Sequence, residues 1–271
     1  MRNPLLHRIF DSVCSISPAI RRSAWKIWYR YITELDKGAQ VTFMNYGYAD
    51  PKKIILKKSD EKDRYCIQLY HHVASAVSLK GRDVLEVGCG RGGGSSYIMR
   101  FIKPISMTGV DFSNKAVEFC KEHHSVKGLS FRVGDAESLP FKDRKFDVVI
   151  NIESSHCYGS MMSFLREAFR VIRPGGYFLF ADFRCKDEID GLRNQLTLSG
   201  FEITKEERIT PNILKSLDIN NKRKLEIINQ KVPKLLQKPF FDFAGIKGTP
   251  VYESFRNGNS EYLNFVLKKR A

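Results

Sequence analysis

The 271-residue sequence predicts an α/β fold built on a doubly wound, mostly parallel seven-stranded sheet. From residue 83 onward, short apolar segments alternate with amphipathic helical segments, which is typical of a parallel sheet covered on both faces. A glycine-rich turn follows the first apolar segment, and such turns shape the ligand site of many sheets of this kind. Further helical segments precede the sheet and interrupt it before its last strand.

The first 80 residues are expected to form a helical cover. Apolar side chains recur at helical spacing through residues 5–34, and Pro18 separates two short amphipathic helices there. A loop with Tyr46 and Tyr48 follows, and a further helix is predicted over 60–78.

The alternating pattern places each strand and helix of the core. Strands are predicted at 83–88, 106–111, 129–133, 145–152, 176–181, 201–208 and 261–268. Helices are predicted between them at 94–102, 114–124, 161–172 and 188–199. The third helix ends before Arg173-Pro174-Gly175-Gly176, because proline cannot continue a helix.

A basic segment at 211–258 separates the last two strands and is too long for a turn. It is predicted to be a helical lid. The chain is therefore expected to divide into a helical cover (1–80), a ligand-binding core (81–208), a lid insertion (209–258) and the last strand of the core sheet (259–271).

The net charge of +15 is concentrated at the two ends of the chain. Residues 1–40 hold seven Lys/Arg against three Asp/Glu, and residues 204–271 hold fourteen against seven. Charge of this kind suits nucleic acid, an anionic membrane or an acidic substrate equally well. The first residues show no secretory pattern, and the six cysteines form no C-x-x-C pair, so a reduced cytoplasmic protein without a metal site is expected.

The turn after the first strand reads Glu86-Val87-Gly88-Cys89-Gly90-Arg91-Gly92-Gly93-Gly94. Glycines here let the chain turn sharply and let a ligand approach the backbone closely. Because Gly88, Gly90 and Gly93 satisfy G-x-G-x-x-G, a Rossmann-like dinucleotide site is one interpretation.

Two carboxylates narrow the choice of ligand. Asp111 ends the second strand, where it could accept hydrogen bonds from both hydroxyls of an adenosine ribose. Glu86 lies inside the apolar first strand, and a buried carboxylate is costly without a polar or cationic partner. S-adenosylmethionine carries an ammonium and a sulfonium, whereas a pyrophosphate would be repelled. Asp111 alone suits NAD and S-adenosylmethionine equally, so Glu86 is the residue that favours S-adenosylmethionine.

The order of these motifs resembles the class I methyltransferases. It comprises Glu86 to Arg91, then Asp111, then Gly134-Asp135-Ala136-Glu137, then Arg173 to Gly176. The resemblance implies that Gly88, Cys89 and Gly90 pass the methionine part of the cofactor and that Asp111 holds its ribose. It further implies adenine contacts from Phe112, Asp135 and Ala136, and a place for Asn151 beside the cofactor.

The fourth strand leads into Glu153-Ser154-Ser155-His156, and the fifth ends in Ala181-Asp182-Phe183. Both loops should face the cofactor, because ligands lie beyond the carboxyl ends of the strands. The pair resembles the E-S-x-H and A-D-F motifs of small-molecule O-methyltransferases, which implies that His156 is a general base supported by Asp182. His156 as mere pocket lining and Asp182 as a strand-end cap are the simpler alternatives.

Residues along nearly the whole chain resemble the phthiotriol and phenolphthiotriol dimycocerosate methyltransferases. The matching segments are Phe43 to Tyr48, Gln68 to His71, Gly92 to Tyr97, Ser155 to Tyr158 and Gly245 to Thr249. The resemblance implies O-methylation of a hydroxyl on a hydrophobic small molecule, polyketide or lipid. Tyr46, Tyr48, Glu153 and Tyr158 are then expected to line the acceptor site.

Three other functions stay open at this point. C-methylation of a sterol, quinone or tocopherol-like ring uses the same sheet motifs. An RNA-modifying enzyme would fit the charge, but no RNA-binding module is recognisable, so no nucleic-acid partner is expected. A protein that only senses S-adenosylmethionine is the third. We expect a monomer or homodimer, and the basic N-terminal helices could contact an anionic membrane.

Overall fold

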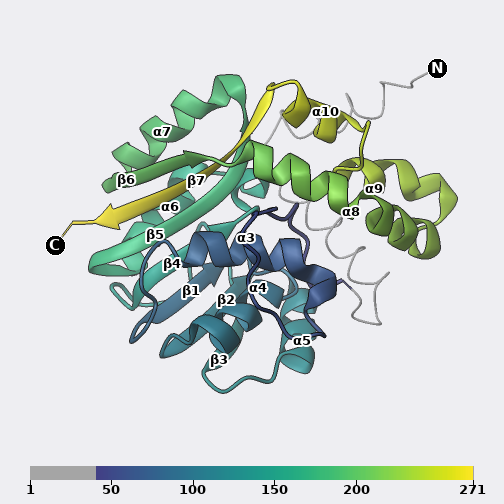
Figure 1. Ribbon diagram of the computed structural model, residues 1–271. Helices are drawn as coiled ribbons and strands as arrows, with labels where there is room; N and C mark the ends of the chain where they lie inside the picture. The colour runs from purple at the N-terminus through teal and green to yellow at the C-terminus, as the bar shows by residue number, and fades with distance from the viewer. Residues whose placement is uncertain (1–40, 271) are drawn as a thin grey trace.

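The structure is a computed structural model that describes residues 41–270. The helices predicted over 5–34 lie outside the described residues. The core is a seven-stranded sheet in the order β3-β2-β1-β4-β5-β7-β6 (Figure 1). Only β7 runs antiparallel to its neighbours, β5 and β6. The predicted doubly wound, mostly parallel sheet is therefore confirmed.

The strands occupy the segments that the apolar pattern predicts. They are β1 (Asp83–Val87), β2 (Ser106–Asp111), β3 (Leu129–Val133), β4 (Phe146–Ile152), β5 (Ile172–Cys185), β6 (Phe201–Arg208) and β7 (Ser260–Lys269). β1 is central and pairs with β2 on one side and β4 on the other. The carboxyl ends of these three strands consequently lie together at one edge of the sheet, where they hold the site.

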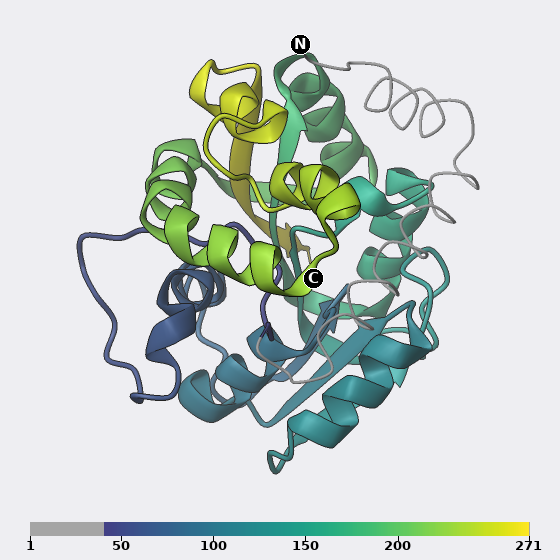
Figure 2. The same ribbon diagram turned by 90° about the vertical axis from the view of Figure 1, so that its right-hand side faces the viewer.

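Helices cover both faces of the sheet (Figures 1 and 2). They are α3 (Arg64–Ala74), α4 (Gly93–Tyr97), α5 (Asn114–His123), α6 (Met161–Val171), α7 (Ile189–Leu198), α8 (Thr210–Lys231), α9 (Gln237–Phe243) and α10 (Pro250–Arg256). Alternate strand residues enter different cores: Val84 packs with α3 residues such as Ile67, and Leu85 packs with α6 residues such as Phe164. This alternation follows from the two-residue period of a strand.

The fifth strand is longer than the sequence indicates. The preceding helix ends at Val171, and β5 already begins at Ile172, before Pro174. It continues past Asp182 because Phe183, Arg184 and Cys185 pair with Tyr262, Glu261 and Ser260 of β7. The helix predicted over 94–102 is also divided: α4 ends at Tyr97 and a π-helical turn occupies Ile98–Ile102.

The predicted insertion before the last strand consists of α8, α9 and α10, which lie beside the carboxyl edge of the sheet and face the reader in Figure 2. The loop at 45–49 is attached to α8 by three hydrogen bonds. The Ala49 N–H donates to the Asn212 carbonyl at 3.1 Å, the Asn212 amide donates back to Ala49, and the Ser216 hydroxyl donates to the Tyr46 carbonyl. Within residues 41–270, no helix is long and apolar enough to cross a membrane.

Candidate active site

A pocket at this edge, here called the donor pocket, is formed in part by the turn between β1 and α4. Gly88 and Gly90 have φ angles of 75° and 51°, which side-chain-bearing residues rarely adopt. A Cβ at Gly88 would overlap the side chains of Ser154 and Tyr158. Glycine is therefore required here both for the backbone conformation and for the close approach of the loop after β4.

Asp111, at the end of β2, lines this pocket. One of its carboxylate oxygens accepts the Gly90 N–H at 2.9 Å, and the other accepts the Ser113 N–H at 2.9 Å. Burial raises the pKa of Asp111, and the two N–H groups partly oppose that shift. Each carboxylate oxygen can accept more than one hydrogen bond, so Asp111 is able to receive two ribose hydroxyls as well.

The remaining wall of the donor pocket comes from Phe112 and from the turn after β3, with Asp135 and Ala136. Phe112 is 40% exposed at the rim. Four carboxylates line the pocket against one arginine; they are Asp111, Asp135, Glu137 and Glu153, opposite Arg91. In a chain of net charge +15, this acidic lining suits a cationic ligand and disfavours a pyrophosphate. The residues therefore fit S-adenosylmethionine.

Glu86 lies behind the pocket wall and is not one of the lining residues. It is fully buried, accepts the Tyr70 hydroxyl at 2.6 Å, and also accepts the Ser95 hydroxyl. Burial raises its pKa to about 7, although both hydroxyls lower it. The polar partners expected for Glu86 are thus Tyr70 of α3 and Ser95 of α4. Tyr70 lines the donor pocket, whereas Glu86 does not.

Asn151 is also behind the wall. Its amide nitrogen donates to the Val87 carbonyl, the Ser154 hydroxyl and the Tyr158 hydroxyl at 2.7–2.9 Å. Ser154 and Tyr158 line the donor pocket, whereas Asn151 does not. Asn151 therefore positions two pocket residues without lining the pocket itself, and its place beside the cofactor stays a prediction. Cys89 does line the pocket, as the sequence predicts.

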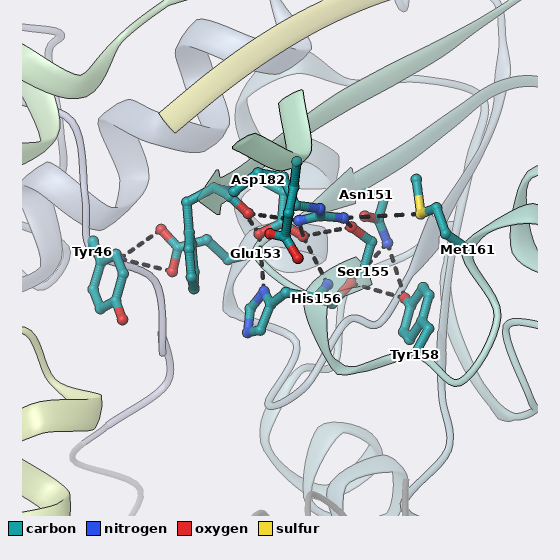
Figure 3. A network of polar contacts seen from close by, with 12 residues as sticks. Tyr46, Asn151, Glu153, Ser155, His156, Tyr158, Met161 and Asp182 are labelled. Atoms are coloured by element: carbon teal, nitrogen blue, oxygen red, sulfur yellow. Dashed lines mark hydrogen bonds and ion pairs between the residues drawn. The ribbon is translucent and has the colours of Figure 1, made fainter. Parts of the chain in front are cut away.

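His156 and Asp182 are brought together at the ends of β4 and β5 (Figure 3). His156 Nδ1 lies 2.9 Å from Asp182 Oδ1, and the His156 backbone N–H donates to Asp182 Oδ2 at 3.1 Å. Phe183 packs on the imidazole, with ring centroids 4.5 Å apart. The ring is thus fixed with its Nε2 edge directed away from the carboxylate.

The charges around this pair determine its protonation. Burial lowers the pKa of His156, but the neighbouring Cys157 and Asp182 outweigh burial and raise it well above its usual range. Burial raises the pKa of Asp182, but His156 and Arg184 outweigh burial and hold it well below its usual range. Both shifts favour the charged forms, because an imidazolium and a carboxylate at this distance stabilise each other.

Glu153 begins the same loop in a left-handed conformation, with φ at 46°. Its two carboxylate oxygens accept the Tyr46 N–H at 2.9 and 3.1 Å. Burial raises the pKa of Glu153 to about 7; the Tyr46 N–H lowers it, and the Asp182 charge raises it further. Because Tyr46 also contacts α8, Glu153 joins the donor pocket to the lid.

A second, mainly apolar pocket lies beside the donor pocket, and we call it the acceptor pocket after the role expected for Tyr46. It is lined by Val41, Phe43, Met44, Asn45, Tyr46, Asp63, Cys66, Asn220, Arg223, Lys224, Ile227, Ile228, Lys231, Val232, Phe240, Phe243 and Ala244. Phe43, Met44 and Asn45 line both pockets and so form the wall between them. Tyr48 lines neither pocket; it is buried and stacks on His72, with centroids 4.3 Å apart.

Several site residues are not evident from the sequence motifs. Ser155 donates to Asp182 at 2.6 Å, and Arg184 lies 3.3 Å from the same carboxylate and donates to Ser155. Lys224 lies on α8 with its ammonium 5.5 Å from the Tyr46 ring centroid. Ser155 stands inside the E-S-x-H motif and could have been found there, whereas Arg184 and Lys224 meet the site only through β5–β7 pairing and lid packing.

The amino-acid sequence is similar to those of known methyltransferases. A family model described as a methyltransferase domain matches residues 78–238. The phthiotriol/phenolphthiotriol dimycocerosates methyltransferase of Mycobacterium tuberculosis is 36% identical over 255 residues, which cover 93% of this chain and 94% of that protein. The fatty-acid O-methyltransferase of Mycolicibacterium smegmatis is 37% identical over 254 residues, which cover 93% of this chain and 92% of that protein.

Solved structures share the fold at lower identity. The cyclase SpnF superimposes with a TM-score of 0.69 at 20% identity over 91% of this chain and 95% of its own. The geranyl diphosphate C-methyltransferase of Streptomyces coelicolor A3(2), solved with S-adenosyl-L-homocysteine, gives 0.65 at 16% identity over 92% of this chain and 97% of its own. From the family match, the full-length relatives and the fitting donor pocket, we conclude that this chain belongs to the S-adenosylmethionine-dependent methyltransferases.

Proposed function

We propose that this enzyme methylates an oxygen, in the first place a hydroxyl, on a hydrophobic small molecule, polyketide or lipid. The observation that carries the proposal is the His156–Asp182 pair, 2.9 Å apart, with His156 in the loop after β4 whose Ser154 and Cys157 line the donor pocket. An alcohol is a poor nucleophile until its proton is removed, and a positioned imidazole can accept that proton once the imidazole is itself neutral.

Each residue of the pair has a separate task in this mechanism. Bound S-adenosylmethionine supplies a methyl group made electrophilic by its sulfonium. His156 Nε2 accepts the acceptor's hydroxyl proton as the oxygen bonds to that methyl group. Asp182 keeps the Nδ1 proton facing itself and stabilises the imidazolium that results. Phe183 excludes water from one face of the ring.

The apolar pocket would hold the acceptor's hydrocarbon part. Its walls combine Met44, Ile228 and Phe240 with the aromatic ring of Tyr46. Most of the gain in rate would come from holding the acceptor oxygen in line with the methyl group and the sulfur. The two full-length relatives are named for lipid acceptors, a phthiotriol or phenolphthiotriol dimycocerosate and a fatty acid, which supports a lipid-like acceptor for this chain.

A carboxylate acceptor is the second candidate, because the pKa of His156 is raised well above its usual range. A carboxylate is already an anionic nucleophile and needs no base. An imidazolium at His156, aided by the half-buried ammonium of Lys224, would instead attract and orient it. The name of the fatty-acid O-methyltransferase is consistent with this second reaction.

The pH dependence of turnover separates the two acceptors. With a hydroxyl acceptor, kcat/KM should rise as His156 loses its proton, with a midpoint above the usual histidine value. With a carboxylate acceptor, kcat/KM should fall through the same midpoint.

A donor with a labelled methyl group would show whether the label is on oxygen or carbon. Label on a ring carbon, or release of product without any dependence on His156, would contradict the proposal.

A further inference from the structure

The lid carries an exposed apolar feature at the turn between two of its helices. We define the lid tip as residues 231–238, which join α8 to α9. Leu235 is 95% exposed and Leu236 is 39% exposed. Among the exposed large apolar side chains of residues 41–270, these two form the only adjacent pair. Large apolar side chains that protrude together mark a surface that meets another apolar phase or partner.

The same hairpin closes the acceptor pocket from within. Val232 lies within the tip, and Phe240 follows shortly after it. Each of these side chains is 7% exposed and packs with Ile228 and Ile246 in a small core. They also line the acceptor pocket. The outward leucines and the inward pocket wall are thus two faces of one short segment, so a surface that receives the leucines lies next to the pocket.

The charge around the leucines is of one sign. Lys231, Lys234 and Lys238 lie within the tip, and no acidic residue occurs between Glu226 and Asp242. Lys234 and Lys238 are exposed beside the leucines. Apolar side chains surrounded by lysines are the pattern of proteins that rest on an anionic bilayer, with the apolar groups at the acyl boundary and the lysines among the headgroups.

A second copy of this chain is a poor occupant of the same surface. A twofold contact through the tip would place Lys234 and Lys238 against the same lysines of the partner, because such an interface pairs a patch with itself. The chain as a whole is also strongly basic, at +15. The charge therefore complements an anionic lipid surface and opposes self-association.

We propose that the lid tip docks the enzyme on an anionic lipid surface, with Leu235 and Leu236 inserted and the lysines at the headgroups. Because Val232 of the tip also lines the acceptor pocket, the contact places the membrane next to that pocket. Uptake of the acceptor from that surface rests on the proposed function, whereas binding to the surface does not. The lid tip shares no residue with the N-terminal segment for which the sequence predicts a membrane contact.

The test is co-sedimentation of the full chain with vesicles of phosphatidylglycerol and phosphatidylcholine. Wild-type protein should pellet with mixed vesicles and far less with phosphatidylcholine alone. Leu235→Ser with Leu236→Ser should lower vesicle affinity on the order of tenfold or more. Lys234→Gln with Lys238→Gln should lower it about fivefold per lysine on the mixed vesicles only. Leu198→Ser is the matched control, since Leu198 is 69% exposed on α7, far from the lid.

Thermal melts of all variants verify that the fold is kept, and activity need not be measured. Failure of wild-type protein to pellet would overturn the proposal. So would pelleting of the leucine variant equal to wild type, because the contact would then lie elsewhere on the chain. A change from dimer to monomer caused by the leucine variant in analytical ultracentrifugation would identify the patch as an interface between copies and would also overturn it.

Discussion

Asp182 holds His156 at two points, the ring Nδ1 at 2.9 Å and the backbone N–H at 3.1 Å. The carboxylate therefore fixes both the rotation of the imidazole and the path of the loop that carries it. Because Asp182 is fully buried, removing its charge changes the pKa of His156 more than removing a surface carboxylate would.

His156→Ala should leave S-adenosylmethionine affinity nearly unchanged and lower turnover by about 100-fold or more, as expected when a general base is lost. His156 is not among the residues that line the donor pocket, so the two effects should separate. Calorimetry gives the affinity, and single-turnover kinetics give the rate. An unchanged rate would reduce His156 to a structural neighbour of Asp182.

Asp182→Asn should lower turnover by less than His156→Ala does, because the asparagine oxygen can still orient Nδ1 without the charge. The pKa of His156 should fall, because Asp182 is one of the charges that raises it. The midpoint of the pH–rate profile should therefore move to lower pH. A profile with an unmoved midpoint would show that the observed titration belongs to another group, such as Glu153.

Asp111→Ala should weaken S-adenosylmethionine binding by ~1–3 kcal/mol, the scale for losing charge-assisted hydrogen bonds to a bound ligand. Asp143→Ala is the control, because that side chain is 71% exposed and pairs with Arg170 instead of lining the donor pocket. Calorimetric titration compares both variants with wild type. Equal affinities for all three proteins would remove Asp111 from the ribose site.

Glu86→Gln should change how stability depends on pH. The folded-state pKa of Glu86 is raised from the usual 4.5 to about 7. The contribution of Glu86 to the free energy of unfolding is therefore fully present below about pH 4.5 and is lost as pH rises toward 7. Relative to wild type, the variant should gain ~3 kcal/mol in unfolding free energy between about pH 5 and about pH 8. Urea unfolding at both pH values measures this, with exposed Glu118→Gln as control. A constant difference between wild type and Glu86→Gln would contradict the burial argument.

The sheet was predictable because its signals are local. The spacing of apolar residues and the turn residues place the strand boundaries within a few residues. The end of β5 differs because pairing with β7 extends this strand beyond Asp182. Residue partners in the site were predictable only when both stood in recognised motifs, as His156 and Asp182 do. Glu86 was recognisable as an acid needing a partner, but Tyr70 comes from a helix that precedes β1 and reaches it only in the folded chain.

The position of Tyr48 depends on distant contacts in the same way. Tyr46 and Tyr48 are two residues apart in one loop, and nothing local separates their roles. Gly47 lies between them with φ at 81° and turns the chain. Tyr46 then faces the acceptor pocket while Tyr48 stacks on His72. That outcome depends on α8 and α3, which pack on the loop from distant parts of the sequence.

Gly47→Ala tests the coupling between lid and site. A Cβ at Gly47 would overlap the Ser216 hydroxyl on α8 and lie 3.0 Å from the Tyr65 backbone, in addition to the strain of a positive φ. Gly81→Ala is a matched control, since Gly81 has a φ of 78° and open space around it. Gly81→Ala should cost about 1–2 kcal/mol of unfolding free energy through backbone strain alone.

Gly47→Ala should cost more than that control, by about 1–3 kcal/mol, because Ser216 or the loop must move. Since the loop also carries the Tyr46 N–H that donates to Glu153, the KM for the acceptor should rise while affinity for S-adenosylmethionine changes little. Denaturant unfolding and steady-state kinetics on both variants measure the two effects. If the two glycine variants lose the same stability and keep the same KM, the packing of the 45–49 loop on α8 contributes nothing to the acceptor site.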